Sequence, residues 1–248
     1  MPLRALFDGA LFAESYGEGP PRVLALHGWG RRGNDFARSL AGFDALAVDL
    51  PGFGATPAPA EPIGARGYAD VLAPVLEMFD SPPALLGHSF GGRIAVCLAA
   101  ASPERVGPLV VTGTPLLRKA PSRKPSVGYR LIRTLNQAGL VSDRRIEEIR
   151  RSRGSADYRA ATGVMRDILV KVVNETYEDE LGRLESRVML LWGGEDHEVP
   201  VEVAEESLRL IRRSGGSAEL EVLDGVGHLV PTQAPDALAR VLEEVMAR

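Results

Sequence analysis

The sequence predicts an α/β fold, with a mostly parallel β-sheet covered by helices on both of its faces. Short apolar runs alternate along the chain with longer segments in which apolar residues recur at helical spacing. This alternation is typical of βα units, in which each helix returns the chain so that the next strand runs parallel to the last. At 248 residues the chain is long enough to bury one substantial core.

The predicted elements begin with a β-hairpin in residues 1–16 that turns at Asp8-Gly9. Apolar runs then predict six strands, near Val23–Leu26, Ala45–Asp49, Ala84–Leu86, Leu109–Thr112, Val188–Trp192 and Glu219–Leu223. Helical spacing predicts four helices, near Tyr68–Asp80, Gly91–Ala101, Val201–Ser214 and Pro235–Ala247. Since parallel strands end at one edge of the sheet, functional residues are expected in the loops at their carboxyl ends.

A long segment interrupts this alternation between about Pro115 and Leu181. It contains no strand pattern, and helices are expected at Tyr129–Ala138, Arg144–Arg151 and Val164–Val173. The segment follows the predicted strand Leu109–Thr112, which is the sixth strand when the two strands of the hairpin are counted. We therefore divide the chain into a first core part (residues 1–114), a helical cap or lid (115–182) and a second core part (183–248).

The most informative motif is Gly87-His88-Ser89-Phe90-Gly91, which fits G-x-S-x-G and lies between a predicted strand and a predicted helix. A sharp strand-to-helix turn forces its apex residue into strained backbone geometry, with φ expected above zero at Ser89. Glycines two residues before and after the serine leave room for the turn. The pattern predicts a nucleophilic serine, presented at the N-terminus of a helix.

A serine hydroxyl needs a base to take its proton, and an acid to orient that base. Of the four histidines, His228 lies in a glycine-rich loop between the last predicted strand and the C-terminal helix, where it can reach across the edge of the sheet. Asp196 lies in the loop after the strand that ends at Trp192 and is the predicted acid. Glu195 and Glu198 remain alternatives for that role.

An oxyanion hole is predicted where the strand Val23–Leu26 runs into His27-Gly28-Trp29-Gly30. The glycines allow backbone N–H groups to turn toward one point, and the predicted donors are the amides of Trp29 and Phe90. His27 is expected to brace this loop. His88, which flanks the serine, is a candidate for contact with substrate.

Together these motifs resemble the α/β-hydrolase superfamily, over residues 1 to about 114 and about 183 to 248. They comprise His27-Gly28-Trp29-Gly30, Asp49-Leu50-Pro51-Gly52-Phe53-Gly54, the turn at Ser89, the loop Trp192–Pro200 and Gly227-His228. The sequences of the first two motifs most resemble those of the biotin-pathway pimeloyl-carrier-protein methyl ester carboxylesterases. The resemblance implies a carboxylesterase that works through an acyl-serine intermediate with a Ser89-His228-Asp196 triad, with no metal and no cofactor.

Other activities fit the same residues. Ring-cleavage C–C bond hydrolases and a menaquinone-pathway lyase have similar sequence motifs, and both would use the predicted serine and histidine. A non-catalytic ligand receptor on a hydrolase scaffold belongs to another class, and an intact triad disfavours it. A fluorophosphonate would label the serine of a hydrolase, while product analysis separates the bond types.

The predicted cap carries the expected pocket and an unusual charge. The substrate pocket is predicted to be lined by Leu131, Ile132, Leu135, Val164, Ile168 and Leu169, although packing of the cap onto the core explains them equally well. Residues 116–171 contain fourteen Lys and Arg against five acids, a charge of +9, which leaves −13 for the rest of a chain whose net charge is −4. Such a cap would attract an acidic acyl-carrier protein, an anionic acid substrate or a phospholipid surface, or else its charges are simply solvated helix faces.

Several classes are disfavoured by composition. The longest apolar stretch, Ile94–Ala101, has eight residues, far short of a membrane span, and residues 1–16 lack a signal-peptide core. The single cysteine, Cys97, excludes an internal disulfide and a cysteine-based metal cluster. No nucleic-acid-binding module is recognisable. We expect a cytoplasmic enzyme that acts on a small acyl ester, and the oligomeric state is not predicted.

Overall fold

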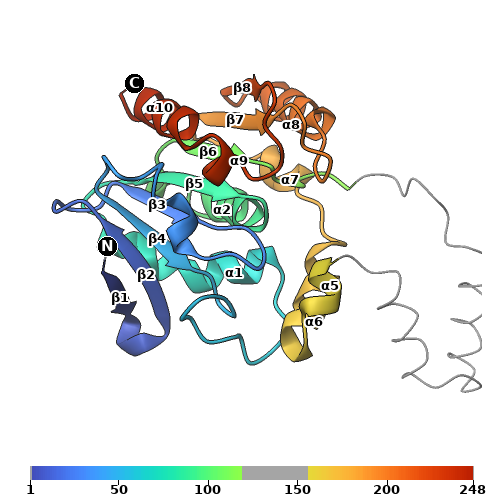
Figure 1. Ribbon diagram of the computed structural model, residues 1–248. Helices are drawn as coiled ribbons and strands as arrows, with labels where there is room; N and C mark the ends of the chain where they lie inside the picture. Colours follow the sequence, from blue (N-terminus) through green and yellow to red (C-terminus); the bar gives the residue numbers. More distant parts are fainter. Residues whose placement is uncertain (1, 119–155, 248) are drawn as a thin grey trace, which may run out of the picture.

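The computed structural model describes residues 2–118 and 156–247, and within them the chain forms one eight-stranded sheet (Figure 1). The strands are β1 (Leu3–Leu6), β2 (Leu11–Tyr16), β3 (Val23–Leu26), β4 (Ala45–Asp49), β5 (Ala84–His88), β6 (Leu109–Thr112), β7 (Val188–Gly193) and β8 (Ala218–Leu223). Their order across the sheet is β1-β2-β4-β3-β5-β6-β7-β8. Only the β1–β2 and β2–β4 pairs are antiparallel, so the predicted mostly parallel sheet is confirmed.

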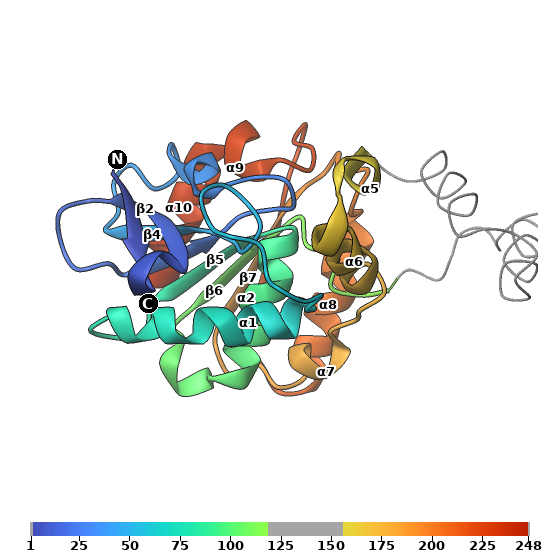
Figure 2. The same ribbon diagram turned by 90° about the horizontal axis from the view of Figure 1, so that it is seen from below.

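Helices cover both faces of the sheet (Figure 2). One face packs against α1 (Ala65–Leu72), α2 (Phe90–Ala101), α7 (Glu178–Leu181) and α8 (Val201–Arg213). The other packs against a 3₁₀ turn (Gly33–Phe36), α9 (Val230–Gln233) and α10 (Pro235–Met246). Strand β3 shows why both faces are apolar. Leu24 and Leu26 belong to the first core and Val23 and Ala25 to the second, because successive side chains of a strand point to opposite faces.

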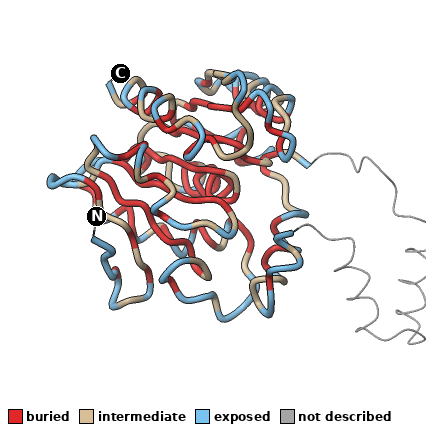
Figure 3. Tube along the Cα trace, in the orientation of Figure 1, coloured by how far each residue is buried: buried red, intermediate tan, exposed pale blue. Residues whose placement is uncertain are grey.

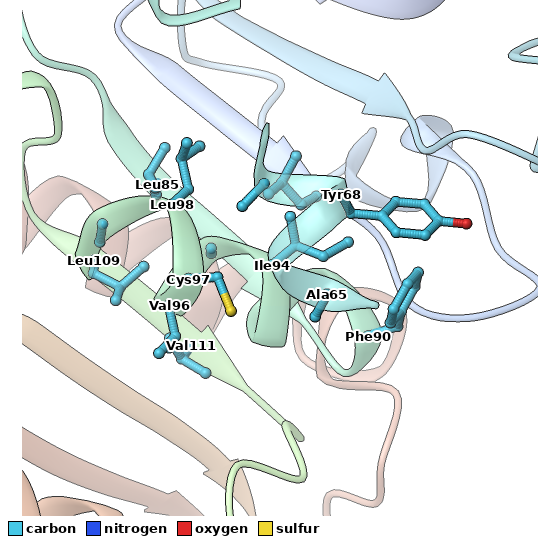
Figure 4. Close-up of a cluster of buried hydrophobic side chains, with 14 of the residues drawn as sticks. Ala65, Tyr68, Leu85, Phe90, Ile94, Val96, Cys97, Leu98, Leu109 and Val111 are labelled. Carbon is cyan, nitrogen blue, oxygen red and sulfur yellow. The ribbon is translucent and has the colours of Figure 1, made fainter. Parts of the chain in front are cut away.

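The helix after the serine turn, α2, lies in the middle of the first core. Its residues 90–99 are all buried, and Figure 3 shows the central strands buried around it. Small side chains let α2 approach the sheet closely, while Ile94 and Leu98 contribute larger apolar groups to the core (Figure 4). Buried on this scale, α2 is a rigid support for the residue at its N-terminus.

The predicted helix Tyr68–Asp80 is the element that differs most from expectation. In the structure α1 begins earlier, at Ala65, and a 3₁₀ helix, Ala73–Met78, replaces its second half. Pro74 explains the change, because its ring removes a backbone donor and disfavours the continued α-helix. The earlier start has a tertiary cause, since the Ala65 N–H donates at 3.0 Å to Oε2 of Glu175, a residue 110 positions later in the sequence.

Between β6 and β7 the described part of the chain contains α5 (Ala156–Ala160), α6 (Gly163–Val172) and α7. Helix α6 matches the helix predicted at 164–173, whereas those predicted at 129–138 and 144–151 lie outside the described residues. Figures 1 and 2 both show α5 and α6 to one side of the sheet. Within the described residues no helix is long and apolar enough to cross a membrane.

Candidate active site

The turn from β5 to α2 places Ser89 in a strained conformation. Its φ is 52° and its ψ is −111°, so the positive φ predicted from the motif is confirmed. A Cβ on Gly91 would lie 2.0 Å from the Leu26 carbonyl oxygen, and one on Gly87 would lie 2.5 Å from the Cα of Gly92. Both distances are impossible contacts, so the spacing of the motif is a steric requirement of the turn.

The predicted base and acid meet this serine at the edge of the sheet. Ser89 Oγ lies 3.1 Å from Nε2 of His228, and Nδ1 of the same ring lies 2.8 Å from Asp196 Oδ2. The residues come from three separate loops, after β5, β7 and β8. Glu195 is exposed, and Glu198 approaches the wrong ring nitrogen, with its Oε2 3.8 Å from Nε2. Of the three candidate acids, only Asp196 lies where it can accept the Nδ1 proton.

Asp196 is held rigidly by its own loop. Its Oδ1 accepts hydrogen bonds from the backbone N–H groups of Glu198 at 2.9 Å and Val199 at 2.7 Å. The carbonyl of Val199 in turn accepts a bond of 2.7 Å from the indole Nε1–H of Trp192, which is fully buried. One carboxylate oxygen therefore organises the loop, and the other remains for the histidine.

Burial and hydrogen bonding act in opposite directions on this pair. Burial of Asp196 opposes its ionisation, but the bonds from His228 and the Val199 and Glu198 amides outweigh burial and lower its pKa. Burial also lowers the pKa of His228, and the hydrogen bond and charge of Asp196 outweigh that effect, so the net pKa is raised above 6.5. The pair is thus arranged to stabilise an imidazolium at His228.

The loop after β3 lies directly against the serine. A Cβ on Gly28 would be 3.3 Å from Ser89 Cβ, and the Gly91 N–H donates to the His27 carbonyl at 3.0 Å. Among the described residues neither the Trp29 nor the Phe90 amide has a hydrogen-bond partner in the protein. Two backbone donors beside the serine are therefore available to a ligand.

His27 holds the peptide that carries one of these donors. Its Nδ1–H donates to the Gly28 carbonyl at 2.7 Å, and its Nε2 accepts from the Leu50 N–H at 2.9 Å. The Gly28 carbonyl and the Trp29 N–H belong to the same planar peptide, so a bond to the oxygen also orients the N–H. Burial lowers the pKa of His27 to about 4, which keeps it neutral.

An aromatic cluster under this loop was not foreseen from the sequence. The ring of Trp29 lies edge-on to those of Phe53, at 4.9 Å between centroids, and Phe90, at 5.3 Å. Tyr68 packs against Phe90 from α1, at 5.0 Å (Figure 4). Edge-to-face contacts of this kind stabilise by about 0.5–1.5 kcal/mol each. The cluster couples the two segments that carry the free amides.

His88 does not line the cavity that opens above the serine. It is 2% exposed, and its Nε2–H donates to the backbone carbonyl of His228 at 3.0 Å. Burial, with the nearby His228 as a second cause, lowers the pKa of His88 to about 3. The structure therefore does not bring His88 to the position of substrate contact predicted from the sequence, because the strand directs its side chain behind the loop of the base.

A cavity of about 190 Å³ opens above the serine. It is lined by Trp29, Ser89, Phe90, Arg93, Pro115, Asp157, Leu169, Val172, Val173, Glu198, Val199 and His228. Of the predicted pocket residues, Ile168 is buried in the core and Val164 packs against it, and neither lines this cavity. Leu131, Ile132 and Leu135 lie outside the described residues. The predicted residue Leu169 does line the cavity, together with Val172 at the end of α6 and Val173 just after it. Their i, i+3, i+4 spacing is the signal that identifies that face.

The pH dependence of any reaction that uses His228 as a base follows from these pKa shifts. The neutral ring is the reactive form, so activity is expected to rise with pH through one transition whose midpoint lies above 6.5. His27 and His88 stay neutral over this range and add no transition. A profile of kcat/KM from pH 5 to 9 measures the midpoint. A midpoint below 6.5 would contradict the arrangement of His228 with Asp196.

A mostly parallel sheet with helices on both faces and a strained serine turn at its carboxyl edge defines an α/β hydrolase. The chain belongs to the alpha/beta hydrolase family, whose model matches residues 23–241. Among the described residues, no group of three or more His, Cys, Asp and Glu side chains is arranged to hold a metal ion.

Relatives of this chain include hydrolases of two kinds. It is 29% identical to a 2-hydroxy-6-oxononadienedioate/2-hydroxy-6-oxononatrienedioate hydrolase of Cupriavidus pinatubonensis, over 93% of this chain and 88% of the relative. It is also 29% identical to lipase LipV of Mycobacterium tuberculosis, over 94% of this chain and 96% of the relative. A pimeloyl-[acyl-carrier protein] methyl ester esterase of Chromobacterium violaceum is 44% identical over 42% of this chain and 41% of its own length. The protein is a hydrolase of this family.

Proposed function

We propose that this protein hydrolyses carboxylic esters through an acyl-serine intermediate on Ser89. The observation that carries the proposal is the hydrogen-bonded series from Ser89 Oγ to His228 Nε2 at 3.1 Å and from His228 Nδ1 to Asp196 at 2.8 Å. A strained, rigidly supported serine next to a base and an oriented acid is the arrangement that nucleophilic catalysis needs. The lipase and esterase among the relatives support the same reaction class.

Acylation would begin when His228 Nε2 takes the proton of Ser89 as its oxygen attacks the ester carbonyl. The carbonyl oxygen gains a negative charge, which the free amides of Trp29 and Phe90 would stabilise. As the tetrahedral intermediate collapses, the C–O bond to the alcohol breaks and His228 returns the proton to that leaving oxygen. Asp196 stabilises the transient imidazolium.

Deacylation would repeat these steps with water. His228 takes a proton from the water molecule, whose oxygen attacks the acyl carbonyl, and the same amides hold the second oxyanion. Collapse of this intermediate breaks the bond to Ser89, and His228 returns the proton to the serine oxygen. The products are a free acid and the regenerated enzyme.

A series of p-nitrophenyl esters from acetate to dodecanoate tests the proposal. Turnover is expected to peak at one acyl length, because the cavity of about 190 Å³ is small and bounded on one side by residues of α6. The Ser89→Ala protein is measured in parallel as the blank. Equal turnover by the two proteins, or none by either, would exclude esterase activity for the site.

C–C bond hydrolysis is the second candidate. It is favoured by the relative from Cupriavidus pinatubonensis, which aligns over most of both chains. The same serine and histidine would act, with a carbanion carbon as the leaving group in place of an oxygen. Product analysis with a 2-hydroxy-6-oxo dienoate beside the ester series separates the two reactions.

We also propose that residues 115–182 act as a cap over the site, and that its basic residues attract an acidic carrier protein. The cavity lining from α5 and α6 supports the first point. Ten of the fourteen basic residues in 116–171 lie outside the described residues, so the second rests on charge alone. Turnover of a carrier-bound ester is then expected to fall as ionic strength rises. Turnover that does not change with salt would exclude the carrier protein.

A further inference from the structure

Arg93 is a charged side chain that the steps above do not use. It lies on α2 one turn after Ser89, and residues four apart share a face of a helix. Its side chain lines the cavity above the serine, although only 8% of the residue's surface is exposed. A buried guanidinium beside a candidate nucleophile calls for a physical explanation.

The charge of Arg93 has no carboxylate partner among the described residues. The guanidinium donates through Nη1 to the Val172 carbonyl, and its Nε–H is buried without a hydrogen-bond partner. It lies over the ring of Tyr177 at 5.9 Å from the centroid. Glu175 acts on Arg93 electrostatically, but it forms no ion pair with it and instead accepts hydrogen bonds from Tyr177 and the Ala65 amide.

Burial without an ion pair is unfavourable for an arginine. Removal from water lowers the pKa of Arg93, and the interaction with Tyr177, including a hydrogen bond, and the charge of Glu175 only partly offset this effect. The group remains charged, because arginine is protonated in proteins at all ordinary pH values. A buried cation with unused donors is stabilised when an anion enters beside it.

A second cavity gives such an anion room. It has a volume of about 280 Å³ and shares Arg93, Pro115, Val173, Glu198 and Val199 with the cavity above the serine. Arg93 thus lines both spaces, and the second continues away from the nucleophile. A substrate whose acyl carbon lies at Ser89 can extend past this guanidinium.

We propose that Arg93 binds a carboxylate at the far end of the acyl chain, so that the preferred substrates are half-esters of dicarboxylic acids. The inference rests on the ester hydrolase proposed above and names its substrate class. The fork of N–H donors on a guanidinium matches the two oxygens of a carboxylate. Bound there, the carboxylate provides the ion pair that Arg93 lacks among the described residues, and fixes the distance to the scissile carbonyl.

Other charges around the two cavities act more weakly. Asp157 and Glu198 are exposed, and the side chain of Glu198 is 72% exposed, so water screens their repulsion of an anion. Glu175 is engaged by its two donors, and Arg118 adds an exposed positive charge at the second cavity. Arg93 is the buried member of this set, and electrostatic interactions are strongest for buried charges.

The test compares the monomethyl and dimethyl esters of α,ω-diacids with four to eight carbons. Wild type is expected to prefer the half-ester of one chain length in kcat/KM. Arg93→Met, which keeps the length of the side chain and removes the charge, is expected to lose about tenfold to a hundredfold on that half-ester, the range for a charge-assisted hydrogen bond. Its rate on the neutral diester is expected to change less than threefold.

Two control variants separate binding from damage to the fold. Arg93→Lys keeps the charge without the fork and is expected to retain part of the preference for the half-ester. Arg66→Met removes the neighbouring arginine, which also contacts the Tyr177 ring but pairs with Glu180 and lines neither cavity. It is expected to leave the ratio of half-ester to diester unchanged.

A binding measurement tests the carboxylate site of Arg93 independently of the proposed esterase activity. Calorimetric titration of the free diacids and matched monoacids needs no turnover, and diacids are expected to bind at least tenfold more tightly to wild type than to Arg93→Met. Equal binding of diacid and monoacid to wild type, or an equal loss on both esters in Arg93→Met, would overturn the proposal. Diacid binding without any ester turnover would keep the anion site and reject the esterase.

Discussion

Replacing Ser89 by alanine is expected to lower kcat for the best ester about a million-fold, as does loss of the nucleophile in other hydrolases with a triad. Alanine at 89 keeps the short side chain, so the fold is expected to persist while the attacking oxygen is lost. His228→Ala is expected to cost about as much, because the serine is then without a base. Single-turnover kinetics with a p-nitrophenyl ester measures both losses.

The double variant makes this prediction sharper. Ser89 and His228 act as one unit, so removing both is expected to lower kcat little more than removing either one. If the two acted independently, their separate fold losses in kcat would multiply. Ser102→Ala, at the other end of α2, is the matched control and is expected to keep wild-type turnover. A fluorophosphonate is expected to label the control and not Ser89→Ala. Labelling of Ser89→Ala at another serine, with full activity, would show that the nucleophile lies elsewhere.

Local motifs carried most of what could be predicted. The geometry at Ser89 follows from five consecutive residues, because glycines at 87 and 91 are the only residues that fit against Gly92 and Leu26. The strands were equally predictable, since burial on both faces makes each one a short apolar run. His228 and Asp196 were found because the ends of parallel strands converge at one edge.

Features that depend on tertiary contacts could not be predicted in this way. The direction of His88 is set by the loop that carries His228, which is 140 residues away. The early start of α1 depends on Glu175, and that Arg93 has no ion pair within residues 2–118 and 156–247 depends on Glu175 being held by other donors. No local pattern contains these relations. Two local signals were missed: Pro74, since proline disfavours the interior of a helix, and the helical spacing that puts Val172 and Val173 on the same face as Leu169.

Replacing Asp196 by asparagine is expected to lower kcat/KM about 10⁴-fold, the second largest effect, although the loop can keep its structure. The asparagine Oδ1 can still accept from the Glu198 and Val199 amides. Its NH₂ group would then face Nδ1 of His228 as a donor. The ring would carry its proton on Nε2, the tautomer that cannot take the proton of Ser89.

The pH profile of Asp196→Asn distinguishes this cause from simple disruption. Burial lowers the pKa of His228, and Asp196 supplies the main opposing effects, so loss of its charge is expected to move the midpoint of kcat/KM to lower pH than in wild type. Glu195→Gln, an exposed neighbour in the same loop, is the control and is expected to match wild type in both rate and midpoint. A near-normal rate in Asp196→Asn, together with a large loss in the control, would transfer the role of the acid to Glu195. A reduced rate with an unmoved midpoint would mean that Asp196 supports the loop without setting the pKa of the base.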